Sequence, residues 1–118
     1  MPIILNSMGE LAQARLDNTT ITSIFSPASG KTVQISLVHV SNSTASAATF
    51  RLFLDNDGTT YNESTQLAWD VSVPAKQFID MAFERALYMN NASGNLAFQE
   101  GTANALTISV YGSTFTIT

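Results

Sequence analysis

Apolar and polar residues alternate with a period of two along most of this chain. Such alternation places the apolar side chains on one face of an extended strand, so it is typical of half-buried β-strands. The clearest segments are 33–40, 49–54, 95–99 and 106–111, and weaker ones are 11–16, 20–25, 78–83 and 115–117. Only the stretch 63–69 could hold a helical turn. The sequence therefore predicts an all-β protein.

Turn-forming residues separate these segments at short intervals. Gly, Pro, Asn, Asp and Ser gather at 27–30, 41–44, 55–58, 90–94 and 101–102, and such clusters favour chain reversals between strands. We therefore expect an antiparallel β-sandwich of about eight short strands, with jelly-roll or immunoglobulin-like connections. The length of 118 residues suits one domain. We assign residues 11–118 to this single domain and residues 1–10 to an N-terminal arm or edge strand.

Charge is scarce in the sequence. Only 12% of the residues are charged, about half of the roughly 25% usual in soluble proteins. Interface cores are poor in Lys and Glu, so the composition fits a surface covered by copies of the chain or by a larger assembly. It fits a neutral, Thr-rich β protein equally well. The five basic residues are scattered and the net charge is −4, so we expect no nucleic-acid partner.

No motif in the sequence points to catalysis or to a cofactor. The chain has no cysteine, which removes disulfides, thiolate metal ligands and a cysteine nucleophile. Nucleophile-elbow, zinc-protease and phosphate-loop motifs are missing as well. The segment 55–58, Asp-Asn-Asp-Gly, lacks the flanking acidic residues of a calcium loop and is predicted to be a turn. His39, the only histidine, is predicted to be structural. We expect no catalytic, cofactor-binding or metal-binding residue, and hence no enzyme.

The first residues combine a short apolar run with an absence of positive charge. This run is too short for a signal peptide or a membrane span, so we expect a chain retained in the cytosol where it is made, with no membrane partner. Ile3, Ile4 and Leu5 are our candidates for assembly contacts, because three exposed aliphatic side chains in a row need a partner. The alternative is a first strand, residues 2–6, that joins the edge of its own sheet.

Two aromatic residues support a different hypothesis. Tyr61 and Trp69 could stack on a sugar ring, as in a carbohydrate-binding module. In the competing interpretation, Trp69 closes one end of the hydrophobic core, because it lies among the apolar residues Leu67, Ala68 and Val71.

Local patterns from residue 11 to residue 112 resemble a group of small bacteriophage virion proteins. That group has an early Leu-x-Gln-Ala, a Thr-rich strand, a turn like Pro-Ala-x-Gly-Lys-Thr, a strand ending at Asn, an Ala-Thr-Phe-Arg strand and a closing strand. The matching segments here are Leu11-Ala12-Gln13-Ala14, Thr19-Thr20, Pro27-Ala28-Ser29-Gly30-Lys31-Thr32, Val40-Ser41-Asn42, Ala47-Ala48-Thr49-Phe50-Arg51 and Ala103-Asn104-Ala105-Leu106-Thr107-Ile108-Ser109-Val110-Tyr111-Gly112.

The resemblance implies a non-enzymatic virion structural protein, assembled in the host cytoplasm, that decorates or cements a phage capsid. Its partners would be copies of itself, often as a homotrimer, and the major capsid protein or other virion proteins, bound through multivalent contacts. The same sandwich could serve as a tail or neck component, or as a carbohydrate-binding module of a tail or fibre. The resemblance carries over no functional residue, and residues 1–10 and 113–118 extend beyond it.

Overall fold

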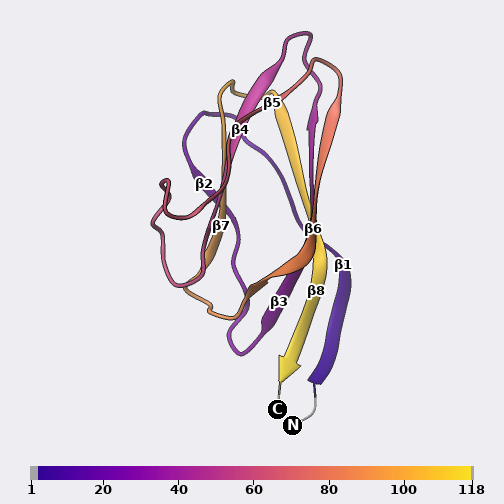
Figure 1. Cartoon of the computed structure of the whole chain (residues 1–118), viewed down its shortest axis with the longest axis vertical. Coiled ribbons are helices and arrows are strands. Elements are labelled where there is room, and N and C mark those ends of the chain that lie inside the picture. Colours follow the sequence, from indigo (N-terminus) through magenta and orange to yellow (C-terminus); the bar gives the residue numbers. More distant parts are fainter. Residues whose placement is uncertain (1–2, 118) are drawn as a thin grey trace.

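The computed structural model describes residues 3–117, which form two packed antiparallel sheets (Figure 1). The strands are β1 (Ile3–Arg15), β2 (Thr22–Phe25), β3 (Thr32–Asn42), β4 (Ala48–Asp55), β5 (Gln66–Val73), β6 (Phe78–Met89), β7 (Asn95–Glu100) and β8 (Leu106–Ile117). Sheet A has the order β1-β8-β3-β6, and sheet B has the order β2-β7-β4-β5. The predicted all-β sandwich of about eight strands is confirmed. Met1, Pro2 and Thr118, which belong to the predicted arm and domain, lie outside the described residues.

The strand pairing follows one rule. β1 pairs with β8, β2 with β7, β3 with β6, and β4 with β5, always antiparallel. This is the arrangement of a long hairpin that has been rolled up, and contacts of β3 with β8 and of β4 with β7 complete the two sheets. Of the two expected connectivities, the structure therefore has the jelly roll.

The core lies between the sheets and is built from the alternating residues. Ile35, Val38, Phe50, Leu52, Phe98 and Ile108 are among its members, all at most 1% exposed. A bulge at Ser36 shifts the register of β3 against both of its neighbours. Because of this bulge, Ile35 and Val38 both point inward, while Leu37 points outward. The bulge explains why the alternation in the sequence breaks at Val38.

The structure differs from the sequence prediction at residues 63–69 and 115–117, among other places. No helical turn forms at 63–69: Asn62 accepts the backbone N–H of Thr65 in a turn, and β5 begins at Gln66. The segment 115–117 is not a separate strand, because β8 continues to Ile117 opposite β1. Over residues 3–117, no helix is long and apolar enough to cross a membrane.

Gly112 marks a close approach of β8 to β3. A Cβ atom at this position would lie 1.9 Å from the backbone oxygen of Gln34 and 3.0 Å from the Cα of Ile35. Backbone atoms cannot move aside as a flexible side chain can, so only glycine fits between these strands.

We expect Gly112→Ala to lower the free energy of unfolding by about 3 kcal/mol, since the extra methyl group overpacks the sheet and forces the backbone apart. Urea denaturation followed by circular dichroism measures the change. Ser113→Ala, a control at the neighbouring position, is expected to stay within about 0.5 kcal/mol of the parent. A Gly112→Ala variant as stable as this control would contradict the close approach.

Candidate assembly surface

The ends of β1 and β8 leave the sandwich together as a two-stranded ribbon (Figure 1). Ile3, Ile4 and Leu5 pair with residues 117, 116 and 115 of β8. β3 pairs with β8 only as far as Thr32, opposite residue 115. Beyond that point the ribbon has no neighbouring strand within residues 3–117. An isolated two-stranded ribbon is marginally stable in water, so further contacts would stabilise this end of the molecule.

Ile3, Ile4 and Leu5 fit both alternatives given for them, an exposed contact and a strand at the edge of the sheet. They lie in the edge strand of sheet A, yet their side chains stay open to solvent: Ile3 is 65% exposed, Ile4 50% and Leu5 49%. Joining the sheet therefore does not bury them. Exposed aliphatic groups gathered at one end of a molecule are typical of a contact surface.

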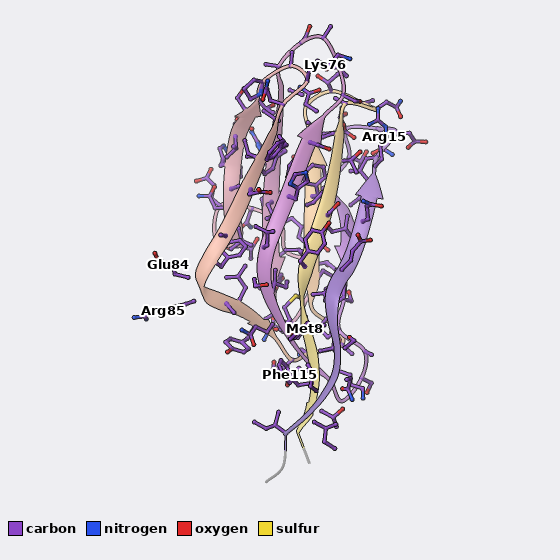
Figure 2. The ribbon with its side chains drawn as sticks, turned by 90° about the vertical axis from the view of Figure 1, so that its right-hand side faces the viewer. Met8, Arg15, Lys76, Glu84, Arg85 and Phe115 are labelled. Atoms are coloured by element: carbon purple, nitrogen blue, oxygen red, sulfur yellow. The ribbon has the colours of Figure 1, made fainter. Side chains whose placement is uncertain are left out.

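The apolar surface continues from the ribbon onto the outer face of sheet A (Figure 2). Met8, Ser113, Gln34 and Tyr88 lie opposite one another across the four strands, so their side chains point the same way. That direction is outward, because the next residues of β3 and β6 are buried. Met8 is 76% exposed and Tyr88 61%.

An apolar hollow of about 200 Å³ lies on this face, lined by Ile3, Thr32, Gln34, Tyr88 and Phe115. Sites for small molecules usually measure about 300–1,000 Å³, so the hollow suits a protruding side chain better than a ligand. We use the name apolar patch for the exposed and half-buried residues around it, Ile3, Leu5, Met8, Tyr88 and Phe115.

Farther along the same face, polar side chains form a row across the sheet. Asp80, His39, Ser109 and Gln13 lie opposite one another on β6, β3, β8 and β1. Nδ1 of His39 lies 2.5 Å from Oδ1 of Asp80, and Nε2 of Gln13 donates to the Ser109 hydroxyl at 3.0 Å. Ser109 is only 3% exposed and, within the described chain, makes no hydrogen bond to His39. The row therefore works as a set of cross-strand contacts and not as a hydrolytic triad.

Trp69 lies on the outer face of sheet B and not at the end of the core. Its ring packs edge-to-face on Phe53, on which Tyr61 also packs, with ring centroids 6.1 Å apart in both pairs. The Arg51 guanidinium lies 3.7 Å from the centroid of the Trp69 ring and is held there by Asp70 at 2.6 and 3.1 Å. Arg51 thus covers one face of the indole ring, and a sugar cannot stack on that face.

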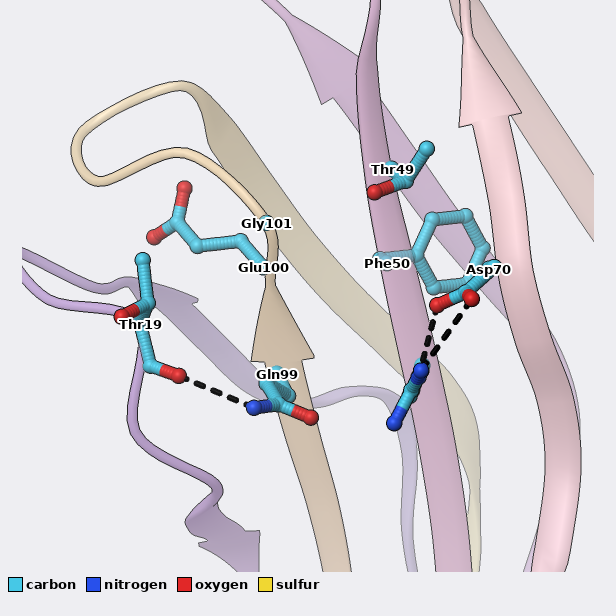
Figure 3. A pocket seen from close by; sticks show the side chains of 8 residues that line it. Thr19, Thr49, Phe50, Asp70, Gln99, Glu100 and Gly101 are labelled. Carbon is cyan, nitrogen blue, oxygen red and sulfur yellow. Dashed lines mark hydrogen bonds and ion pairs between the residues drawn. The ribbon is translucent and has the colours of Figure 1, made fainter.

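A polar groove of about 290 Å³ runs beside this ion pair (Figure 3). Its lining includes Thr19, Thr49, Arg51, Asp70 and Gln99. Gln99 donates to the backbone oxygen of Thr19 at 3.0 Å, and the hydrogen bond to Arg51 lowers the pKa of Asp70. Two of the charged side chains that line the groove, Arg51 and Asp70, therefore bond to each other, whereas Oε2 of a third, Glu100, is buried without a hydrogen-bond partner among the described residues.

Glu100 is the one fully buried carboxylate among the described residues, with 0% of it exposed. Its Oε1 accepts the backbone N–H groups of Ala105 at 3.0 Å and Leu106 at 3.1 Å. These bonds fasten the turn between β7 and β8 to the end of the sandwich. Across residues 3–117, no group of three or more His, Asp or Glu side chains is arranged to hold a metal ion.

The segment 55–58 forms a turn, as predicted, at the start of the connection from β4 to β5. The carboxylate of Asp55 accepts the backbone N–H groups of Asp57 at 3.3 Å and Thr60 at 2.8 Å. The bond from Thr60, followed by that from Asp57, lowers the pKa of Asp55. The neighbouring Asp57 carboxyl has a raised pKa, because it shares a hydrogen bond with Asp55 and feels its charge.

Comparison of the sequence with models of known protein families and with curated proteins gave no match. Among solved structures, a chain in the structure of infectious bursal disease virus, Gx strain, is similar over 97% of this chain, with 12% sequence identity and a TM-score of 0.45. This chain spans 32% of that chain. Similarity at this level identifies no family, and it carries no argument about function.

The two aspartates of the turn predict opposite mutational effects. At pH 7 we expect Asp55→Asn to lower the melting temperature, because one oxygen acceptor for backbone N–H groups is lost. We expect Asp57→Asn to raise it, because the charge that Asp55 disfavours is removed. The pKa of Asp55 is lower in the folded protein than the ordinary Asp value of about 3.9. Its carboxylate therefore stabilises the fold at pH values above about 3.9, and this stabilisation is lost as the pH falls through the folded pKa.

Thermal unfolding from neutral to acidic pH measures both effects. The difference between the parent and Asp55→Asn should shrink once the pH falls below about 3.9. The expectation would be wrong if both variants shifted the melting temperature in the same direction at pH 7.

Proposed function

We propose that this protein is a non-enzymatic structural protein of a phage virion, acting as a capsid decoration or cement protein. The observation that carries the proposal is the ribbon at one end of the sandwich, whose aliphatic residues Ile3, Ile4 and Leu5 are about half exposed or more. The segments that resemble small phage virion proteins support the virion assignment. The jelly roll is compatible with it by analogy only, since this fold occurs in viral capsid domains and in lectins.

The ribbon offers two kinds of contact to a capsid shell. Its aliphatic side chains can be buried against the shell, at about 25 cal/mol for each Å² of apolar surface removed from water. Within the described residues the outer edge of β1 has no neighbouring strand, so the backbone groups between its register shifts can add to a short strand of the shell protein. Each contact is small, but a symmetric shell repeats it many times, and repetition raises the strength of attachment.

The arrangement of the polar groups also favours a structural role. Several ionisable side chains bond to the fold itself: Asp80 with His39, Asp70 with Arg51, and Oε1 of Glu100 with a backbone turn. Most of the large apolar side chains of sheet A that stay exposed gather at the ribbon end: Ile3, Ile4, Leu5, Met8 and Tyr88. A surface of this kind works by burial in a contact rather than by reaction with a substrate.

The triple variant Ile3→Thr, Ile4→Thr, Leu5→Thr tests the proposal. Threonine keeps a high strand propensity, so we expect the variant to fold but to bind capsids that lack this protein at least about tenfold more weakly than the parent. Co-sedimentation with such capsids measures the binding. Phe78→Thr removes an exposed apolar side chain (56% exposed) away from the ribbon and should leave binding unchanged.

Undiminished capsid binding by the triple variant would exclude the ribbon as the contact. A parent protein that fails to bind capsids but binds tails would contradict the decoration role and favour a tail or neck component.

The carbohydrate-binding alternative makes a separate expectation. Trp69 is the only tryptophan, so a saccharide that stacked on it would change the fluorescence of the protein. Tyr61 and Trp69 are inclined at 43° and 86° to the same Phe53 ring, so they do not form one flat platform, and Arg51 covers one face of Trp69; we therefore expect no change on titration with a panel of saccharides. A saturable change that Trp69→Phe abolishes would favour the carbohydrate-binding module.

A further inference from the structure

We propose that two copies of this chain pair face to face through the outer face of sheet A, related by a two-fold axis. The axis is parallel to the strands and lies in the plane between the two copies, over the middle of the sheet where β8 and β3 are neighbours. The pairing does not depend on the virion function proposed above. It rests on the shape, charge and size of this face.

The first argument is shape. Met8 on β1 and Tyr88 on β6 stand at the two ends of one cross-strand row. Rotation by 180° about an axis parallel to the strands leaves each cross-strand row at the same position along the strands. It reverses the order of the strands, so that β1 of one copy lies over β6 of the other. Met8 of each copy therefore comes to lie over Tyr88 of the other, at the apolar hollow of about 200 Å³ that Tyr88, Ile3 and Phe115 help to line. Met8 is 76% exposed and flexible, so it can fill such a hollow.

The second argument is charge. On the next row, Glu10 of β1 lies opposite Tyr111, Leu37 and Ala82. Beside Ala82, residues 83–86 of β6 face Ser36 alone, and this bulge carries both Glu84 and Arg85 away from the edge of the sheet (Figure 2).

The same axis that places Met8 over Tyr88 brings the bulge with Glu84 and Arg85 to the level of Glu10 of the other copy, where Arg85 is the side chain of opposite charge. Within the described residues, neither Glu10 nor Arg85 forms an ion pair in its own chain. A self-complementary surface of this kind, on which both contacts occur twice, is what a two-fold interface requires.

The third argument is size. Four strands at about 4.8 Å spacing and about twelve residues at about 3.3 Å rise give the face roughly 750 Å², close to the roughly 800 Å² that each partner buries in a specific interface. The apolar patch lies toward the ribbon end of this face, and the row of Asp80, His39, Ser109 and Gln13 lies farther along it. Such a surface can support pairing at micromolar concentrations.

Sedimentation velocity on the purified full chain, from about 1 to about 100 μM, tests the pairing. We expect a reversible dimer with twice the chain mass of 12.7 kDa. The homotrimer implied by the family resemblance would instead give three times this mass. A monomer throughout the range, or a trimer, would overturn the proposal.

Two variants at one position test the contact of Met8. We expect Met8→Ser to weaken dimerisation at least about tenfold, because it removes the side chain that fills the hollow. Met8→Leu keeps an apolar side chain of similar size and should stay within about threefold of the parent. Circular dichroism and melting temperature check that both variants fold. Equal dimerisation of Met8→Ser and the parent would contradict the contact.

A charge exchange separates the interface from any effect on folding. Glu10→Arg and Arg85→Glu should each weaken dimerisation several-fold, because like charges then meet between the copies. The double variant Glu10→Arg, Arg85→Glu restores opposite charges and should recover most of the affinity of the parent. Additive losses in the double variant would show that the two residues do not meet.

Discussion

The antiparallel pairing of β1 with β8 is the contact on which the rest of this structure depends. β8 lies between β1 and β3, so it joins the first residues of the chain to the middle of sheet A. The pairing runs from Ile3 to Arg15 and continues past the end of β3, which produces the ribbon. It also sets the direction of Met8, which lies opposite Ser113. The apolar patch is thus a consequence of strand register.

The period-two pattern predicted the parts of the fold that local sequence controls. The strands around Ile35, Leu52, Phe98 and Ile108 were all recognised, because each presents an apolar face to the core. β5 was missed, since the turn at 62–65 that precedes it was interpreted as part of a helical turn. The full length of β1 was also not predictable. Its middle, Asn6-Ser7-Met8-Gly9, does not alternate, and it is extended because β8 pairs with it.

The candidate surface was also predictable only where it depends on local sequence. The run Ile3, Ile4, Leu5 is visible in the sequence, whereas Ile3, Tyr88 and Phe115 are far apart in the chain and line one hollow only through the register of sheet A. The position of Trp69 depends on Arg51 in the neighbouring strand, which no local pattern indicates. Non-local pairing therefore decides which exposed residues act together.

The two edges of sheet A differ in how they meet solvent, and this difference favours specific contact over aggregation. Exposed edges are usually protected by charge or by bulges. The β6 edge has both, with a bulge at residues 83–86 that carries Glu84 and Arg85. The β1 edge has register shifts near Asn6 and Leu11, which interrupt its hydrogen-bonding row, and Glu10 is its only charge between Ile3 and Ala14. Bulges hinder open-ended strand addition but leave the side chains exposed. Sheet A thus favours contacts made by its face and by the ribbon, which close on a limited number of partners.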